Sequence, residues 1–213
     1  MAKQARGPGR PANKPGRTDR RKALIDAAAS LFASRGFDSV SVREVAEEAG
    51  VTPAMISYYF KDKQGLQRAV LESGLDHLLE AVSAIGERDD KSIMDEFIST
   101  YIQAINDDPW IPQLMVREVL SRDTPYRDVI VERFASRAAT IMPARILEDI
   151  EAGYLRDDLD PRLMLFSMVG MCLFPYIAAP LLRPVFGYDF DESFAETLIE
   201  HTSKLFFGGA GRQ

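Results

Sequence analysis

The polar side chains between Thr52 and Lys63 are of the kinds that bond nucleic-acid phosphates. Thr52, Tyr58 and Tyr59 carry hydroxyl groups, and Lys63 carries an ammonium group, within a stretch of twelve residues. Hydroxyls and cationic amines are common donors to phosphate oxygens. Such contacts give an affinity that falls with salt and does not depend on base sequence. The stretch therefore predicts a nucleic-acid site, provided that the local fold presents these groups together.

Three residues around this stretch predict two short helices that cross at a steep angle. Ala46 is small enough for close approach, Gly50 tolerates the positive φ of a tight turn, and Ile56 anchors the second helix. This arrangement is typical of a helix-turn-helix. In that motif the N-terminal residues of the second helix reach base edges in the DNA major groove. A plain helical hairpin is the alternative interpretation of the same pattern.

The charge distribution favours the DNA-binding interpretation. The first 63 residues hold twelve basic and seven acidic side chains, whereas the remainder holds fourteen basic and twenty-five acidic ones. The net charge of the whole chain is −6, so its bulk charge does not suggest nucleic acid. A basic front on an acidic body predicts an anionic partner for the front end only.

Helix signals surround the motif and continue to the end of the chain. Ser41 and Glu44 have the spacing of a capping box, Thr52 is expected to cap a helix that has Pro53 at its first position, and Asp62 is expected to cap the next one. The expected helices, about nine in all, are 18–35, 41–49, 52–60, 62–85, 91–106, 110–122, 125–151, 160–183 and 191–207. No alternating strand pattern occurs, so the predicted fold is all-α.

Three regions are expected along the chain. Residues 1–17 form a basic arm that is expected to be disordered, 18–64 a helix-turn-helix DNA-binding domain, and 65–213 a ligand-binding and dimerisation domain. Pro143 is expected to kink or interrupt the helix predicted over 125–151.

Composition argues against several other classes of protein. The single cysteine, Cys172, allows no intrachain disulfide, which fits a cytoplasmic location. The basic N-terminus is followed by no apolar run, so it does not resemble a secretory signal. Residues 163–182 lack charge and could span a bilayer by length, but they include Gly170 and two prolines. We therefore expect a buried or intersubunit helix there and no membrane partner.

The run LFASRGFDSVSVREVAEEAGVTPAMISYYFKDKQGL resembles the DNA-binding domain of the tetracycline-repressor (TetR/AcrR) family of bacterial regulators. The matching motifs are AxxLFxxxGF, VxxVAxxAGV, YYF and KDKxxL, which together cover about residues 20–70. The resemblance implies that bases are read by Arg43, Pro53, Ala54 and Ser57, and an arginine can bond guanine through two parallel hydrogen bonds. The family commonly has a tyrosine at the position of Ser57, so no particular operator sequence is implied.

The basic arm has a motif of its own. Its run RGPGRPANKPGR resembles the core of an AT-hook, an extended segment that lies in a narrow A·T-rich minor groove. We expect Arg10 and Arg17 to contact the minor groove beside the operator. The alternative is a tail that adheres to DNA through charge alone.

For the rest of the chain, the resemblance implies a homodimer that is held by a four-helix intersubunit bundle. Two-fold symmetry would match two half-sites of a double-stranded operator. The residues expected at the dimer interface are Phe194, Leu198, His201 and Leu205. The alternative for each of these residues is a position in the core of the single chain.

The resemblance also implies a ligand cavity within the fourth to eighth helices. Flexible methionines and aromatic side chains suit an adaptable apolar pocket. The residues expected to line it are Trp110, Met115, Met142, Met164, Phe166, Met168, Met171, Phe174 and Tyr176. The polar partners suggested for the ligand are Arg117, Glu118 and Arg145.

The resulting prediction is a ligand-responsive dimeric transcriptional regulator, most simply a repressor that a small apolar or amphipathic effector releases from its operator. The alternative is a DNA-binding regulator without a small-molecule inducer, controlled by a protein partner or by its abundance. No phosphate-cradling glycine loop, metal-ligand spacing or nucleophile–base set is visible in the sequence. We therefore expect neither an enzyme nor a metal or cofactor site.

Overall fold

The computed structural model describes residues 17–83, 85, 92–120, 124–136 and 138–211. The elements are α1 (Arg17–Arg35), α2 (Val42–Glu48), α3 (Ala54–Phe60), α4 (Lys63–Ser83), α5 (Ile93–Asp107), α6 (Trp110–Met115), the π-helical turn η1 (Val116–Leu120), α7 (Arg127–Ser136), α8 (Ala138–Glu151), α9 (Pro161–Ile177), α10 (Ala179–Phe186) and α11 (Glu192–Ala210). Within these residues the strand-like pairing is limited to an isolated bridge between Leu155 and Gly211. The predicted all-α class is confirmed.

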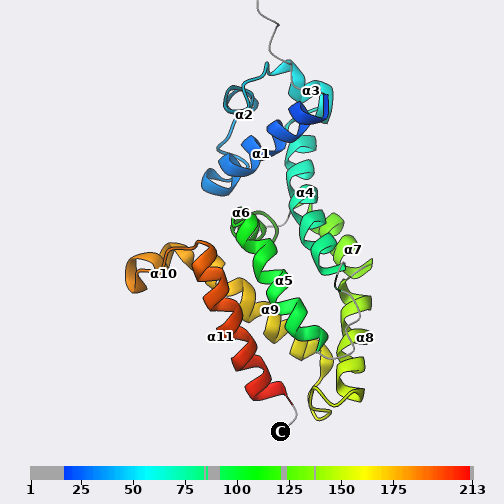
Figure 1. Cartoon of the computed structure of the whole chain (residues 1–213). Helices are drawn as coiled ribbons and strands as arrows, with labels where there is room; N and C mark the ends of the chain where they lie inside the picture. The colour runs from blue at the N-terminus through cyan, green and yellow to red at the C-terminus, as the bar shows by residue number, and fades with distance from the viewer. Residues whose placement is uncertain (1–16, 84, 86–91, 121–123, 137, 212–213) are drawn as a thin grey trace, which may run out of the picture.

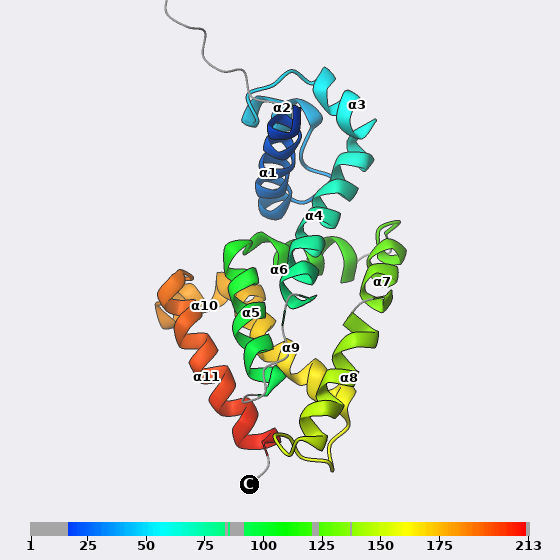
Figure 2. The same ribbon diagram turned by 45° about the vertical axis from the view of Figure 1, so that its right-hand side comes forward.

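The helices are arranged as a small unit at one end of a larger bundle (Figure 1). The small unit consists of α1, α2 and α3, and α4 runs from it into the bundle. The turned view shows α5 and α9 lying between α11 on one side and α8 on the other (Figure 2). The long helix α4 contacts both parts, since it packs on α1 and α3 and also on α5 and α6.

The start and end signals of the front helices are confirmed with one correction. The Ser41 hydroxyl accepts a hydrogen bond from the Glu44 backbone at 3.3 Å, and Gly50 adopts a φ of 64°. The Asp62 carboxylate accepts the Gly65 N–H at 2.8 Å. The cap predicted at Thr52 is wrong, because α3 begins at Ala54 with Pro53 as its N-cap and no side-chain cap bond. Only the carbonyl of Thr52 takes part, by accepting the Met55 N–H at 2.9 Å.

Three of the longer helices predicted for the body are divided. The segment 110–122 is α6 followed by η1, and 125–151 contains both α7 and α8, with Pro143 inside α8 rather than at the break. In the segment 160–183, α9 ends at Ile177, and α10 follows at an angle of 68° to it. Pro180 explains this bend, because it has no N–H for the Tyr176 carbonyl and its ring clashes there. The described residues therefore form eleven α-helices instead of about nine.

The bend between α9 and α10 divides the uncharged residues 163–182, whose length could have spanned a bilayer. Among the described residues no single helix is both long enough and apolar enough to cross a membrane. Only α9 and α10 taken together, across their bend, reach the necessary length and hydropathy.

The buried side chains form two clusters. The first joins α1, α2 and α3 to the first half of α4, and it also includes Leu114, Val119 and Ile130 from the body. The apolar core of the front unit therefore continues past residue 64, where the sequence suggested a boundary. The second cluster fills the space between α5, α8, α9 and α11. It contains Cys172, which is fully buried, and burial raises the pKa of its thiol to about 12.

A buried carboxylate ties α8 to the start of α5. Asp149, which is 3% exposed, accepts hydrogen bonds from the Ser92 hydroxyl and from the backbone N–H groups of Ile93 (3.1 Å) and Met94 (3.3 Å). The N-terminal N–H groups of a helix lack partners within the helix and attract negative charge. Asp149 thus supplies acceptors for α5 from a segment more than fifty residues away in the chain.

We expect Asp149→Ala to lower the free energy of unfolding by about 2–4 kcal/mol, because it leaves several buried donors without an acceptor. Glu148→Ala is the matched control, since Glu148 makes an exposed pair with Arg145 at 3.1 Å and such pairs contribute at most about 1 kcal/mol. Urea denaturation of the two variants measures the difference. Equal losses would show that the Asp149 bonds contribute no more than the surface pair.

Candidate nucleic-acid interface

Helix α3 turns one face to solvent and the other to the core. Ile56 is 1% exposed and Phe60 is 7% exposed, and both belong to the first cluster. The predicted contact residues on the opposite side are exposed, namely Thr52, Pro53, Ala54, Ser57 and Tyr58. The structure therefore brings these five together on one outward surface, which begins just before α3 and continues along it.

The two tyrosines at the end of α3 differ in their surroundings. Tyr58 is 63% exposed, whereas Tyr59 is partly buried and packs against the first cluster. Their rings meet edge to face with centroids 5.0 Å apart. The prediction of a phosphate contact therefore fits Tyr58 better than Tyr59, which also contributes to packing.

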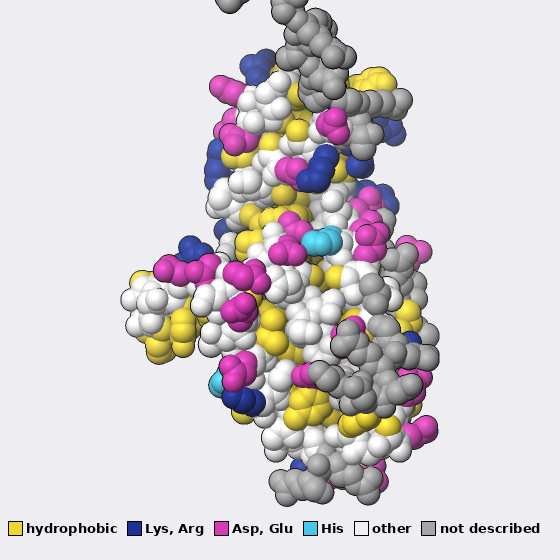
Figure 3. Space-filling view, viewed as in Figure 1, with side chains coloured by type: hydrophobic (Ala, Val, Ile, Leu, Met, Phe, Trp, Pro, Cys, Tyr) yellow, Lys and Arg dark blue, Asp and Glu magenta, His cyan; other side chains and the backbone are white. Residues whose placement is uncertain are grey.

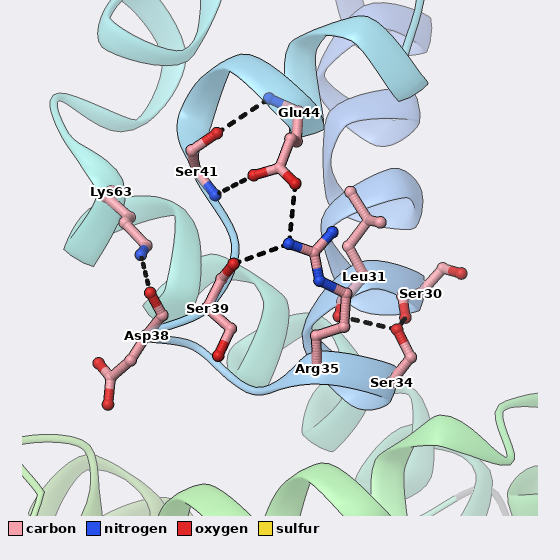
Figure 4. Close-up of polar contacts among 9 residues, drawn as sticks. All are labelled: Ser30, Leu31, Ser34, Arg35, Asp38, Ser39, Ser41, Glu44 and Lys63. Carbon is pink, nitrogen blue, oxygen red and sulfur yellow. Dashed lines mark hydrogen bonds and ion pairs between the residues drawn. The ribbon is translucent and has the colours of Figure 1, made fainter.

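Arg43 lies on α2, whose position is fixed by a small polar network (Figure 4). Glu44 accepts the Ser41 backbone N–H at 2.8 Å and pairs with Arg35 at 2.8 Å, and Arg35 also donates to the Ser39 carbonyl. The Ser41 backbone N–H, then its hydroxyl, then Arg35 lower the pKa of Glu44 to about 2. The cap of α2 therefore keeps its charge at every physiological pH.

Arg43 itself is exposed, and it makes no hydrogen bond or ion pair with any described residue. Its guanidinium is therefore exposed on α2, the helix that precedes α3. This position fits a side chain that bonds a base edge.

Two lysines flank the turn between α3 and α4. Lys63, which was predicted to contact phosphate, donates to the Asp38 carbonyl at 3.5 Å, so its amine lies beside the loop that leads into α2 (Figure 4). Lys61 was missed by the sequence reasoning, although a basic residue directly after YYF was the available signal. It is exposed, and its φ of 79° is costly for a residue with a side chain.

The predicted arm contacts fall outside the described part of the chain. Arg10 precedes the first described residue, and Arg17 begins α1 with a side chain that is also outside the described set. The minor-groove role of both arginines stays a prediction.

The loop after α1 is held by residues of the body. The Glu118 carboxylate in η1 accepts the Phe37 backbone N–H at 3.1 Å, and the neighbouring Arg117 donates to the Ala33 carbonyl at 3.2 Å. Gly36 has a φ of 84°, and a Cβ there would lie 3.1 Å from the Glu118 carboxylate. Glycine at this position therefore permits both the turn and the contact.

A second chain of hydrogen bonds reaches the same loop. Gln67 of α4 donates to the Phe37 carbonyl at 3.4 Å, and the Tyr126 hydroxyl donates to Gln67 at 2.7 Å. Burial, followed by nearby carboxylates, raises the pKa of Tyr126, so its hydroxyl keeps the proton it donates. Phe37 is thus bound through both of its peptide groups by η1 and α4.

These contacts correct the predicted polar partners of the ligand. Arg117 and Glu118 lie at this junction between the front unit and the body, and Arg145 pairs with Glu148. None of the three lines the apolar cavity in the bundle.

That cavity has a volume of about 220 Å³ and lies between α4, α5, α8 and α9. Of the residues predicted to line it, Met142 and Phe166 do so. Trp110 and Met115 pack against the first cluster instead, whereas Met164, Met168, Met171 and Tyr176 belong to the second. Phe174 is 63% exposed on the outside of α9. The sequence reasoning missed the walls formed by α4 and α5.

The residues predicted for the dimer interface divide into two pairs. Phe194 and Leu198 pack within the second cluster, where the Phe194 ring contacts Tyr176 and Phe190. His201 and Leu205 face solvent on α11. The packing of Phe194 and Leu198 follows from the position of α11 against α5 and α9.

Exposed apolar side chains are more numerous on α9 and α10 than the His201 and Leu205 pair on α11. Leu163, Phe166 and Phe174 are each more than 60% exposed along α9. On α10 the exposed apolar residues are Leu181, Val185 and Phe186, and Figure 3 shows hydrophobic side chains on this projecting helix. A group of exposed apolar side chains of this kind often marks a protein contact.

Comparison with known proteins agrees with this geometry. Residues 24–70 match the sequence model described as bacterial regulatory proteins, tetR family. The chain is 30% identical over 93 residues to the HTH-type transcriptional repressor KstR2 of Rhodococcus jostii (strain RHA1), a match that covers 43% of this chain and 46% of that protein. The chain thus matches less than half the length of this relative.

Two further matches extend over most of the chain. The HTH-type transcriptional regulator RutR of Escherichia coli (strain K12) is 26% identical over 194 residues, which is 89% of this chain and 90% of that protein. The structure of the ketosteroid transcriptional regulator KstR2 of Mycobacterium tuberculosis has a similar fold, with a TM-score of 0.73 at 21% identity, and the match covers 91% of this chain and 96% of that one. Residues 24–70, which hold the helix-turn-helix, therefore match the tetR family of bacterial regulatory proteins, and most of the chain shares the fold of the KstR2 structure.

Proposed function

We propose that this regulator is a dimer that binds a double-stranded operator and leaves it when a small apolar or amphipathic effector enters the cavity. The observation that carries the proposal is the position of α4. Lys63 at its start follows α3 by three residues and donates to the loop before α2, whereas Leu78, Leu79 and Val82 near its end line the cavity. A helix of 21 residues extends about 30 Å, so a shift at one end is carried to the other.

The effector can act only by binding one conformer more tightly than another. A ligand that widens the cavity would displace the far end of α4. The α3 helices of the two protomers would then no longer match neighbouring major grooves. The contacts of Glu118 and Gln67 with Phe37 give a second route, because they join η1 and α4 to the loop before α2.

The apolar surface of α9 and α10, with Leu205 and His201 of α11 beside it, supports the dimer. One helix-turn-helix contacts too little DNA for tight specific binding, and a two-fold dimer matches two half-sites. A cavity of about 220 Å³ favours effector control over control by abundance or a protein partner alone. The relative KstR2 of Rhodococcus jostii is a transcriptional repressor, which supports repression as the mode of action.

Genome-wide capture of bound DNA, together with sedimentation velocity of the purified chain, tests the core of the proposal. We expect dimers and an operator with two related half-sites about one helical turn apart.

Phe174→Glu should yield monomers and lose most operator affinity, because it places a charge in the apolar contact. Val131→Glu, at an exposed apolar position of α7, is the control and should remain dimeric. A monomeric wild-type chain without sequence preference would overturn the proposal.

The division of roles in the DNA interface gives a separate prediction. Arg43→Ala should relax the preference at one base position at a cost of about 1–3 kcal/mol. Lys63→Ala should weaken binding to all sequences and reduce the salt slope by about one. Lys22→Ala is the charge-matched control, since Lys22 pairs with Asp26 on α1. Binding titrations on operator and scrambled duplexes at several salt concentrations measure the effects, and identical behaviour of Arg43→Ala and Lys63→Ala would refute these roles.

The junction contact gives a third prediction. Glu118→Ala should speed hydrogen exchange of the Phe37 amide and weaken operator binding by roughly threefold to tenfold, the equivalent of one hydrogen bond. Glu118→Gln keeps an oxygen acceptor and should stay close to the wild type. If operator affinity is unaffected by Glu118→Ala while the Phe37 amide exchanges faster, the junction does not contribute to positioning the DNA-binding unit.

A further inference from the structure

The cavity between α4, α5, α8 and α9 is apolar apart from two side chains. Among the described residues that line it, Arg162 alone is charged, and Tyr101 contributes a hydroxyl. None of these described residues carries a carboxylate. The cationic head of a ligand would lose its hydration here without gaining a counter-ion, so the lining disfavours it.

Arg162 lies at the mouth of the cavity, in the first turn of α9. Its side chain is exposed, and its guanidinium makes no hydrogen bond or ion pair with any described residue. The nearby Asp160 carboxylate is occupied as the cap of α9, where it accepts the backbone N–H groups of Arg162 and Leu163 at 2.8 and 3.4 Å. A planar guanidinium binds a carboxylate through two parallel hydrogen bonds. The mouth therefore suits an anionic head.

Tyr101 contributes a hydrogen-bonding side chain to the lining of the same cavity. The residue is 6% exposed, and its ring stacks on Phe97 with centroids 5.2 Å apart and 16° between the planes. Its hydroxyl has no hydrogen-bond partner among the described residues. Burial raises the pKa of this phenol, which keeps its proton and acts as a donor. A ligand oxygen beside this hydroxyl would accept a hydrogen bond from it.

The volume limits the size of the apolar body. An engineered apolar cavity of about 150 Å³ accommodates a benzene ring, so one of about 220 Å³ takes roughly nine or ten carbon atoms. We propose that the effector is an amphipathic monocarboxylic acid of this size, with its carboxylate on Arg162 and an oxygen within its apolar body bonded to Tyr101. This assignment rests on the effector control proposed above and names the chemical class of the ligand.

Calorimetric titration of the full chain with four probes tests the class. The probes are decanoate, 10-hydroxydecanoate, decan-1-ol and decyltrimethylammonium, which share the apolar body and differ in their polar groups. We expect decanoate to bind at least about tenfold more tightly than decan-1-ol, as a charge-assisted contact implies. We expect 10-hydroxydecanoate to bind more tightly still and decyltrimethylammonium to bind weakest.

Two variants assign the contacts to residues. Arg162→Met should remove the advantage of decanoate over decan-1-ol while leaving the affinity for decan-1-ol within about threefold. Tyr101→Phe should remove the advantage of 10-hydroxydecanoate over decanoate, a change of roughly threefold to tenfold for one neutral hydrogen bond. Arg68→Met is the control, because Arg68 is an exposed arginine of α4 that pairs with Glu72 outside the cavity. Circular dichroism verifies that each variant is folded.

The outcomes separate the two proposals. If decan-1-ol or decyltrimethylammonium binds as tightly as decanoate, or if Arg162→Met leaves the decanoate advantage intact, the anionic class is wrong while the cavity still takes effectors. If Tyr101→Phe leaves the preference for 10-hydroxydecanoate unchanged, the inner contact is wrong. If none of the four probes binds, both this assignment and control through the cavity fail.

Discussion

The continuous burial of α4 is the constraint on which the rest of the structure depends. Its first half packs Leu66, Val70 and Leu75 into the cluster that holds α1, α2 and α3 together. Its second half places Leu78 in the other cluster and forms one wall of the cavity. Because protein interiors are close-packed, neither cluster can rearrange at α4 without a response in the other. The DNA-binding unit is therefore not an independent core on a flexible linker.

The junction around Phe37 strengthens this dependence in a different way. If the loop after α1 were bonded to α1 alone, it would keep its orientation to α1 when the body moved. Here the two peptide groups of Phe37 are bonded to η1 and to α4, and the ring contacts Phe32 and Tyr126 edge to face. A π-helical turn such as η1 is uncommon and often occurs at functional positions. The π-helical geometry of η1 is consistent with a turn whose backbone is shaped by the hydrogen bond between Glu118 and Phe37.

The sequence was most informative where the physics is local. The capping box at Ser41 and Glu44, the turn at Gly50 and the buried Ile56 follow from neighbours within a few residues, and all are found in the structure. The outward position of Ser57 and Tyr58 follows from the helical period once Ile56 is buried. Pro180 was a signal for the bend between α9 and α10, but the unbroken apolar run led to the prediction of a single helix over 160–183.

The cavity and the junction could not be predicted in the same way, because they depend on contacts between distant segments. Phe97 and Tyr101 look like ordinary core residues until α8 and α9 are placed opposite them. Glu118 and Phe37 are 81 residues apart, and nothing local distinguishes this buried glutamate from an exposed one. Methionine and aromatic content indicated an adaptable interior but not which of these side chains would line a space.

The burial of Cys172 has a practical consequence. Only the thiolate form of a cysteine reacts readily, and this thiol is both inaccessible and held protonated at neutral pH. Cys172 in the native chain should therefore not react with maleimide or methanethiosulfonate reagents. A cysteine introduced on the exposed face of α3 would then be the sole labelling site of the chain, and spin labels placed there would report how far apart the two α3 helices lie in the proposed dimer.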